Sequence, residues 1–378
     1  MRQDKLKVLI VDDTALYRKI LRDLLNKMDE VEVIGSVPNG KLALDRIHQL
    51  HPDLLTLDIE MPGMDGLQTL QAIKDREIQV SSIMVSSHTT RDAEITLKAL
   101  ELGAFDFIAK PNGTDLVQNI RVLEEQLHPK IAALYRMLHP KDNLYRSPDA
   151  ESLARNEKPE SVLSGRKYAI IAIGVSTGGP RALAEIIPRI QGNLNVPLVV
   201  VQHMPPVFTR ALAESLNKKS ELTVLEAGEG RELTAGSVYI APGGKQMRLS
   251  RNRAQRVIIE ITDDPPENYC KPSADYLFRS VASIYGRNAL GIILTGMGRD
   301  GTDGLKAMKR RGAGVIAQDK ESCVVFGMPL EAIRAGVVDE VIPLKQIAGK
   351  IYRLVNGVEN GRIPSNGMGI NRSYLGIS

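Results

Sequence analysis

Short apolar runs that alternate with amphipathic segments constrain the fold of this chain more than any other feature of its sequence. From Leu6 to about Met137, each run is followed by turn residues or by a helix start. The predicted strands cover residues 7–11, 31–37, 54–58, 82–86 and 105–109. Such alternation is typical of a parallel sheet with helices on both faces. The pattern therefore predicts an N-terminal, doubly wound α/β domain with a five-stranded parallel sheet.

A second alternating region begins at Tyr168 and predicts a second α/β domain with a mostly parallel sheet. Its strands are predicted over residues 168–174, 197–202, 289–294 and 314–318. The middle of this region differs, because residues 222–262 contain several strand-like runs in succession, separated by glycine-rich turns. These runs include residues 237–241, 246–250 and 257–262. We interpret them as an antiparallel β excursion within the domain.

The residues between the two regions have the composition of a linker. Pro, Ser, Asn and charged residues dominate, and no apolar period is sustained. A chain of 378 residues is also long enough for two or three domains of about 150 residues each. We therefore predict a first domain at residues 1–137, a linker at 138–167, a second domain at 168–356 and a flexible, glycine-rich tail at 357–378.

The composition narrows the class of protein. The formal net charge is only +4 and the charges are interspersed, so neither a nucleic-acid partner nor a membrane surface is indicated. The two cysteines, Cys270 and Cys323, are too few for a disulfide framework and lack the spacing of a zinc motif. No signal peptide is visible, and no apolar stretch reaches the about 18 residues that a spanning helix needs. We expect a cytoplasmic protein that does not insert into membranes.

Acidic and polar residues stand at the ends of the predicted strands in the first domain. Asp12 and Asp13 follow the first strand, Asp58 ends the third, Ser86 ends the fourth, and Lys110 follows the fifth. These positions converge because the carboxyl ends of parallel strands meet at one edge of the sheet. Crowded carboxylates are usually held by a hard cation such as Mg²⁺, and a carboxylate beside a cation and a lysine can attack a phosphoryl donor. A single Asp could instead cap a helix, but the whole set favours a phosphoryl-acceptor site.

The segments LIVDD, LDIEMPGMDG, MVSS and AKP resemble the receiver domain of two-component systems over about the first 125 residues. The resemblance implies that Asp58 is the phosphorylated residue. It also implies that Asp13, Asp58 and the backbone carbonyl of Glu60 bind Mg²⁺, with Asp12 nearby.

The same resemblance assigns three further residues of the first domain. Ser86 and Lys110 would contact the phosphoryl group. Phe107 stands where receivers have an aromatic ring that changes rotamer on activation. On its hydrophobicity alone, Phe107 would simply be a core residue.

A glycine-rich turn in the second domain offers a candidate nucleophile. Residues 174–178 read Gly-Val-Ser-Thr-Gly between a predicted strand and a helix, which matches G-x-S-x-G and would expose Ser176 above the sheet. Such turns also bind phosphate, so a nucleotide site is a competing interpretation. Of the six histidines, only His203 lies beyond the linker, directly after the strand at 197–202. If this domain uses a histidine base, that base is His203.

The acid that would orient His203 is not decided by spacing. Asp300 follows the strand at 289–294 through the run Thr-Gly-Met-Gly, whose backbone is a plausible oxyanion-hole donor. Asp263 and Asp264 also follow a predicted strand. The order Ser, His, Asp differs from the Ser, Asp, His order of α/β-hydrolases, which argues for a separate serine-hydrolase fold.

The segments GVSTGGP, QHMPPVFT, YIAPGG, TGMGRDG and IAQDKESCVVFGMP resemble the catalytic domain of the chemotaxis protein-glutamate methylesterases. With the receiver, the likeness covers roughly residues 5–355. It implies that Ser176 is the nucleophile, His203 the general base and Asp300 its orienting acid. The backbone N–H of Met297 would be an oxyanion donor and Thr177 would line the site, with no cofactor in this domain.

The resemblance also implies a reaction and partners. The reaction would be hydrolysis of glutamyl methyl esters on the cytoplasmic domains of methylated chemoreceptors, and family members also deamidate receptor glutamines. A chemotaxis histidine kinase would be the phosphodonor, so the esterase would serve chemotactic adaptation. The alternative is a response regulator whose output domain binds DNA or a protein without catalysis. Against it, the second half has no helix-turn-helix pattern and no basic recognition helix.

Overall fold

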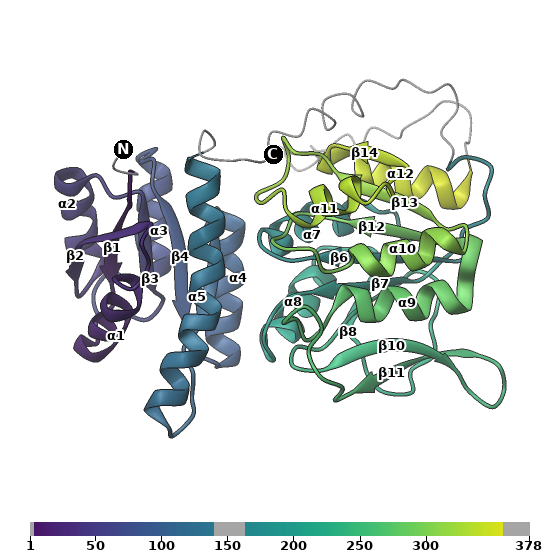
Figure 1. The fold of residues 1–378 in the computed structure, drawn as a ribbon, viewed down its shortest axis with the longest axis horizontal. Coiled ribbons are helices and arrows are strands. Elements are labelled where there is room, and N and C mark those ends of the chain that lie inside the picture. The colour runs from purple at the N-terminus through teal and green to yellow at the C-terminus, as the bar shows by residue number, and fades with distance from the viewer. Residues whose placement is uncertain (1–3, 140–162, 358–378) are drawn as a thin grey trace, which may run out of the picture.

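The computed structural model describes residues 4–139 and 163–357, which form two α/β units that lie side by side (Figure 1). Both predicted α/β domains are confirmed. Most of the predicted linker and tail falls on residues 140–162 and 358–378, which lie outside the described residues. Within the described ranges, no helix combines the length and the apolar character needed to cross a membrane.

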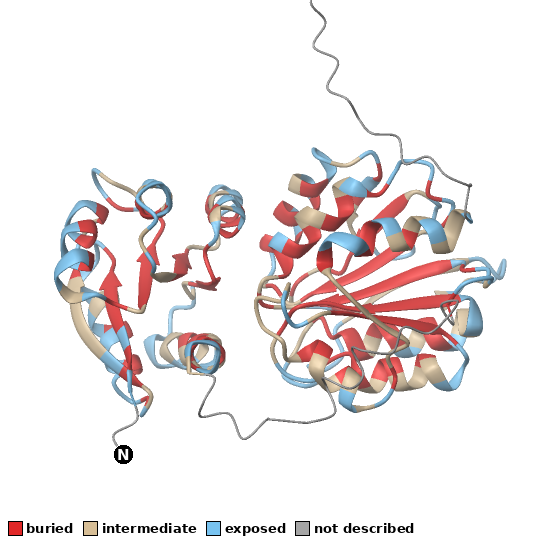
Figure 2. Ribbon diagram, turned by 90° about the horizontal axis from the view of Figure 1, so that it is seen from above, coloured by how far each residue is buried: buried red, intermediate tan, exposed pale blue. Residues whose placement is uncertain are grey.

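The first unit contains five parallel strands in the order β2-β1-β3-β4-β5. The strands are β1 (Leu6–Val11), β2 (Val31–Val37), β3 (Leu54–Asp58), β4 (Ser81–Ser86) and β5 (Asp106–Ala109). The helices are α1 (Ala15–Leu25), α2 (Gly40–Leu50), α3 (Gly66–Asp75), α4 (Thr90–Leu102) and α5 (Leu116–Leu138). Every residue of the central strand β3 is buried, as expected of a strand that helices cover on both faces (Figure 2).

The second unit contains seven parallel strands in the order β14-β13-β12-β6-β7-β9-β8. These strands are β6 (Ile170–Val175), β7 (Leu198–Gln202), β8 (Thr223–Glu226), β9 (Ser237–Ile240), β12 (Ala289–Ile293), β13 (Gly314–Gln318) and β14 (Glu340–Ile342). The helices are α7 (Gly179–Ile186), α8 (Phe208–Asn217), α9 (Ala274–Tyr285), α10 (Thr302–Arg310), α11 (Met328–Arg334) and α12 (Leu344–Asn356), with 3₁₀ turns η2 (Ile187–Arg189) and η3 (Gly286–Asn288).

The predicted antiparallel excursion is correct for two strands and wrong for a third. Strands β10 (Gln246–Arg251) and β11 (Val257–Thr262) form a separate antiparallel pair. Strand β9, which we expected in the same excursion, pairs in parallel with β7 and β8 instead. All residues of β9 are buried, and a strand buried on both faces fits the interior of a parallel sheet rather than an excursion. The three-residue edge strand β14 was not predicted, because so short a run carries little pattern.

Each sheet has a point at which the strand order changes direction between two neighbouring strands that both precede predicted site residues. In the first sheet the neighbouring strands at this point are β1, which Asp12 follows, and β3, which Asp58 ends. In the second sheet they are β6 and β12, and Ser176 directly follows β6. Loops at such a switch point diverge and leave a crevice beyond the carboxyl ends of the strands. The topology therefore places a candidate site in each unit.

Candidate functional site

Ser176 stands at a tight turn between β6 and α7. Its N–H donates to the Thr295 carbonyl (3.0 Å), and its own carbonyl accepts from the Gly179 N–H (2.8 Å). Gly178 has φ +77°, a left-handed conformation that glycine adopts without strain. A Cβ at Gly296 would come within 2.7 Å of the Ser176 Cβ, so the loop after β12 passes directly beside the serine. This close approach requires glycine at position 296.

His203 stands beside Ser176 because their strands pair in register. Val175 lies opposite Gln202 in this register. Ser176 follows Val175 and His203 follows Gln202, so these two residues are neighbours as well. The Gln202 side chain tightens this junction by donating from Nε2 to the Ser176 carbonyl (3.0 Å). The His203 Nε2 lies 2.8 Å from Asp300 Oδ2. The three residues that the sequence separates widely are thus brought to one edge of the sheet.

Asp300 is buried and surrounded by donors. Besides His203, it accepts from Ser273 Oγ (2.7 Å) and from the Ala274 N–H (2.6 Å) at the start of α9. Burial on its own raises the pKa of Asp300, but the hydrogen bond from His203 and these donors outweigh burial and lower the pKa to about 2. The carboxylate is therefore ionised and can only accept hydrogen bonds. It follows that His203 Nε2 carries a proton, and that Nδ1 is the nitrogen left to accept one.

The second ring nitrogen of His203 faces Cys270, a residue to which the sequence assigned no role. Cys270 Sγ lies 3.6 Å from His203 Nδ1. Burial on its own lowers the pKa of His203, but Cys270 and the hydrogen bond to Asp300 together raise the pKa above its ordinary 6.5. The surroundings therefore stabilise imidazolium, which is the form that a histidine base becomes when it takes a proton.

The two alternative acids lie elsewhere. Asp263 is exposed and pairs with Lys271 (2.6 Å) and Lys245 (3.2 Å). Asp264 is also exposed and accepts a hydrogen bond from the Tyr276 hydroxyl. Geometry thus selects Asp300 as the acidic partner of His203, where spacing had left three candidates.

Thr177 directly follows the candidate nucleophile in sequence, and Met297 follows Gly296, which lies beside it. Met297 follows Gly296 in the loop that touches Ser176, and its N–H has no hydrogen-bond acceptor within the described ranges. An amide in that position is free to bind an incoming oxygen. Thr177 is buried, and its Oγ1 donates to Asp106 Oδ2 of the first unit (2.8 Å). The Thr177 side chain therefore links the two units, at a position directly after Ser176.

The first unit holds its predicted acidic cluster. Carboxylate oxygens of Asp12, Asp13 and Asp58 lie within 4.8 Å of one another. Lys110 Nζ bridges two of them, at 2.8 Å from Asp58 and 3.0 Å from Asp12. Burial raises the pKa of Asp58 to about 7 and Asp12 adds to this, although Lys110 opposes the rise. Three oxygen ligands that repel one another fit a hard divalent cation.

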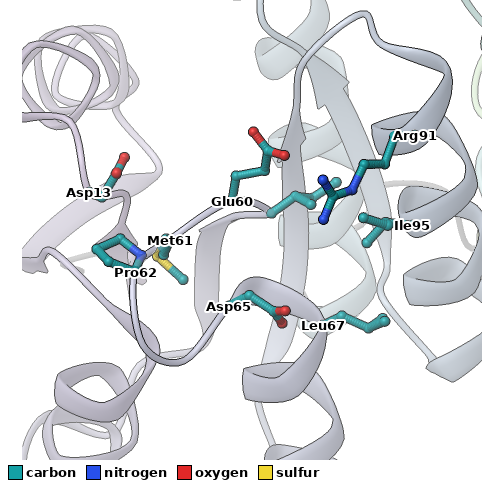
Figure 3. Close-up of a pocket in the computed structure, with 9 residues that line it drawn as sticks. Asp13, Glu60, Met61, Pro62, Asp65, Leu67, Arg91 and Ile95 are labelled. Atoms are coloured by element: carbon teal, nitrogen blue, oxygen red, sulfur yellow. The ribbon is translucent and has the colours of Figure 1, made fainter.

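The remaining predicted receiver residues surround this cluster. Ser86 ends β4 and is fully buried. It lies next to Asp58, because the residue before it, Val85, is the register partner of Asp58. Glu60 lines a pocket of about 380 Å³ beyond the end of β3. Figure 3 shows Asp13 on one side of this pocket and Arg91 on the other, with Glu60 between them. The pocket adjoins the cluster through Asp13.

The two units meet through α4 of the first and α7 and α8 of the second. The Phe107 ring packs against the Phe208 ring with centroids 4.5 Å apart. Asp106 accepts hydrogen bonds from Thr177 and from Lys130, each at 2.8 Å. Sequence reasoning missed Asp106 and Phe208, because no local pattern indicates a contact between domains.

Comparisons with known proteins match both units. Residues 8–121 match the family model of the response regulator receiver domain, and residues 171–351 match that of the CheB methylesterase. A protein-glutamate methylesterase/protein-glutamine glutaminase of Desulfotalea psychrophila is 47% identical, over 93% of this chain and 98% of its own length. One from Salmonella typhimurium is 42% identical, over 95% and 99%. A solved CheB methylesterase catalytic domain of Thermotoga maritima is 46% identical, with a TM-score of 0.49, and covers 50% of this chain and 100% of its own.

Proposed function

This chain belongs to the protein-glutamate methylesterase family in which a receiver domain precedes the catalytic domain, and on that premise we propose that it hydrolyses γ-glutamyl methyl esters of chemoreceptors. The observation that carries the proposal is the contact of Asp300 with His203, which the strand register sets beside Ser176. The substrate would be the cytoplasmic domain of a methylated receptor, so the enzyme would act in the cytoplasm. We assign residues 1–137 to the receiver and residues 168–356 to the catalytic domain.

In the first step, Ser176 Oγ attacks the ester carbonyl while His203 accepts the hydroxyl proton at Nδ1. Asp300 holds the ring through Nε2 and stabilises the imidazolium that forms. The Met297 N–H donates to the oxyanion. The C–O bond to the methoxy group then breaks, His203 returns its proton to the leaving oxygen, and methanol departs from an acyl-enzyme.

In the second step, water attacks the acyl-enzyme and His203 takes a proton from it. The bond to Ser176 Oγ breaks, the proton returns to the serine, and a glutamate side chain is released. A glutamine amide would follow the same path with ammonia as the leaving group. Both reactions would restore a negative charge on the receptor.

Substituting each candidate acid in turn should distinguish Asp300 from Asp263, which spacing in the sequence left as an alternative partner of His203. We expect Asp300→Asn to lower kcat by about 10³- to 10⁴-fold, because an amide cannot stabilise the imidazolium as a carboxylate does. Asp263→Asn is the matched control and should stay close to the parent rate, since its side chain is exposed and pairs only with lysines. Methanol release from methylated receptor membranes measures both. A larger loss for Asp263→Asn than for Asp300→Asn would overturn the assignment.

We also propose that a chemotaxis histidine kinase supplies the phosphoryl group of Asp58. Asp12, Asp13 and Asp58, with the backbone carbonyl of Glu60, would hold Mg²⁺, which neutralises charge on the transferring group. Asp58 would attack phosphorus as the phosphorus–nitrogen bond to the phosphohistidine of the kinase breaks, while Lys110 and Ser86 would bind the phosphoryl oxygens. The cluster of three carboxylates with Lys110 supports this assignment.

Regulation is proposed to work by occlusion, with the unphosphorylated receiver covering the active site. Two contacts support it: Asp106 binds Thr177, the residue after the nucleophile, and Phe107 packs on Phe208. A phosphoryl group adds a charge of about −1.5 to −2 near Lys110. If Phe107 then changes rotamer, its contact with Phe208 is lost and the interface loosens.

Weakening this interface should release the esterase without phosphorylation. We expect Asp106→Ala in the full chain to raise unphosphorylated activity by about tenfold, because a hydrogen bond to a charged group contributes about 1.5–3 kcal/mol. Glu101→Ala is the control, since its pair with Lys219 is solvent-exposed and such pairs contribute about 0–1 kcal/mol. Methanol release is measured with and without a small-molecule phosphodonor. Lower basal activity in Asp106→Ala, despite a normal unfolding temperature, would argue against occlusion.

A catalytic fragment gives an independent test of occlusion. It should begin at Leu163, because that side chain is fully buried and its carbonyl accepts from the Tyr168 hydroxyl. The fragment should release methanol faster than the unphosphorylated full chain, and a phosphodonor should accelerate only the full chain. A slower fragment would show that the receiver is purely an activator. Absence of methanol release from every form would favour the non-catalytic regulator instead.

A further inference from the structure

Cys270 and His203 present two metal-binding atoms to each other beside Ser176. We propose that Cys270 Sγ and His203 Nδ1 form a site for Zn²⁺ or a similarly soft divalent cation, and that occupation of this site reversibly inhibits the esterase. Together with Asp300, they are one of two clusters of potential metal ligands in the described residues. Inhibition rests on the proposed function, because it requires that His203 is the catalytic base. Metal binding does not, because it can be measured without ester hydrolysis.

The distance between the two atoms suits zinc. Zinc binds cysteine sulfur at about 2.3 Å and histidine nitrogen at about 2.0–2.1 Å in tetrahedral geometry, which sets the two ligand atoms about 3.6 Å apart. Cys270 Sγ and His203 Nδ1 are 3.6 Å apart. A cation could therefore enter between them without a change in backbone.

The other ring nitrogen of His203 is already arranged as in a zinc site. Metal-bound histidines almost always donate their second N–H to a carboxylate or carbonyl, which orients the ring and strengthens the ligand. Here Nε2 donates to Asp300 Oδ2 at 2.8 Å. Asp300 is itself fixed by Ser273 and Ala274 at the start of α9. The imidazole is thus held with Nδ1 directed at Cys270.

The loop that carries Cys270 is also held in place. Glu267 and Cys270 exchange two backbone hydrogen bonds (3.1 and 2.7 Å), and both residues between them have positive φ, 50° at Asn268 and 62° at Tyr269. The Asn268 side chain donates to Asp300 Oδ1 (3.2 Å) and to Asp275 Oδ2 (2.8 Å). The turn is therefore tied to the same carboxylate that orients His203. Because both ligand residues are already held by hydrogen bonds, His203 to Asp300 and Cys270 to Glu267, they lose little conformational entropy when a cation binds.

Binding would block catalysis through His203. The Cys270 thiol would lose its proton to solvent as the sulfur–zinc bond forms. A proton on Nδ1 of the imidazolium form would also pass to solvent, and the freed lone pair would form the nitrogen–zinc bond. Water would fill the remaining positions. With Nδ1 occupied, His203 cannot accept the Ser176 proton. Sulfur and imidazole select zinc or cadmium over magnesium, whereas the all-oxygen cluster of the receiver has the opposite preference.

The test compares the full-length chain with Cys270→Ser and with Cys323→Ser, which removes the other cysteine. Methanol release is titrated with Zn²⁺ at fixed Mg²⁺, and Zn²⁺ affinity is measured by calorimetry. Since loss of an outer partner alone costs about 10- to 100-fold in affinity, loss of the sulfur ligand should weaken binding by about 100-fold or more. The parent and Cys323→Ser should lose activity together as Zn²⁺ is added, and Cys270→Ser should retain whatever activity it has without Zn²⁺.

Binding is also read without turnover, by replacing Zn²⁺ with Co²⁺ and recording the sulfur-to-cobalt absorption band. The parent and Ser176→Ala should both show this band, and Cys270→Ser should not. If Ser176→Ala retains esterase activity but still binds Co²⁺ through sulfur, the proposed nucleophile is wrong and the metal site stands. Equal Zn²⁺ inhibition of Cys270→Ser and the parent, or no sulfur band in the parent, would overturn the site.

Discussion

Replacing Ser176 with alanine is expected to lower kcat for methyl-ester hydrolysis by about 10⁴- to 10⁶-fold while leaving the fold intact. The hydroxyl is the proposed attacking group, and only the oxyanion donor and substrate binding would remain without it. Ser176 is partly exposed at the end of β6, so removal of one oxygen creates no buried cavity. The rate is measured as methanol release from methylated receptor membranes.

The control for this loss is Ser250→Ala, a serine of the same domain on β10, which should keep the parent rate. His203→Ala should be about as severe as Ser176→Ala, because His203 is the only histidine of the chain after residue 139. Thermal unfolding of each variant separates loss of chemistry from loss of fold. A folded Ser176→Ala protein with near-normal turnover would exclude this serine as the nucleophile.

Asp58→Asn should abolish incorporation of phosphate from a small-molecule phosphodonor. An amide lacks the anionic oxygen that attacks phosphorus, and it weakens the carboxylate cluster that would hold Mg²⁺. Removal of Mg²⁺ by a chelator should have the same effect on the parent protein. Incorporation is measured with labelled phosphodonor on the full-length chain.

Asp75→Asn is the control for the phosphorylation site, since Asp75 is an exposed carboxylate at the end of α3 and should not affect labelling. Lys110→Ala should reduce activation of the esterase more than labelling, because uptake depends chiefly on the nucleophile and the cation. Labelling of Asp58→Asn at the parent level would mean that another residue receives the phosphoryl group.

The candidate sites were largely predictable, because they depend on positions along single strands. In a parallel sheet, a residue that follows a strand lies at the carboxyl edge wherever the strand sits in the order. This made Asp12, Asp58 and Lys110 readable as one cluster, and Ser176 and His203 as another. The family resemblance added the roles of these residues, which the alternation of apolar and amphipathic segments does not indicate.

Local periodicity by itself determined the two α/β domains, most strand positions and the strand-end residues, since each is a property of a few consecutive side chains. Spacing left the choice between Asp300 and Asp263 open, and although the family resemblance named Asp300, its contact with His203 is seen only in the tertiary structure. The tertiary structure alone decided that β9 joins the parallel sheet and that Cys270 faces His203 Nδ1 across 67 residues of chain. The contact between Phe107 and Phe208 belongs with these. Such contacts depend on how distant segments pack against each other, and no local pattern records which partners burial will bring within a few ångströms.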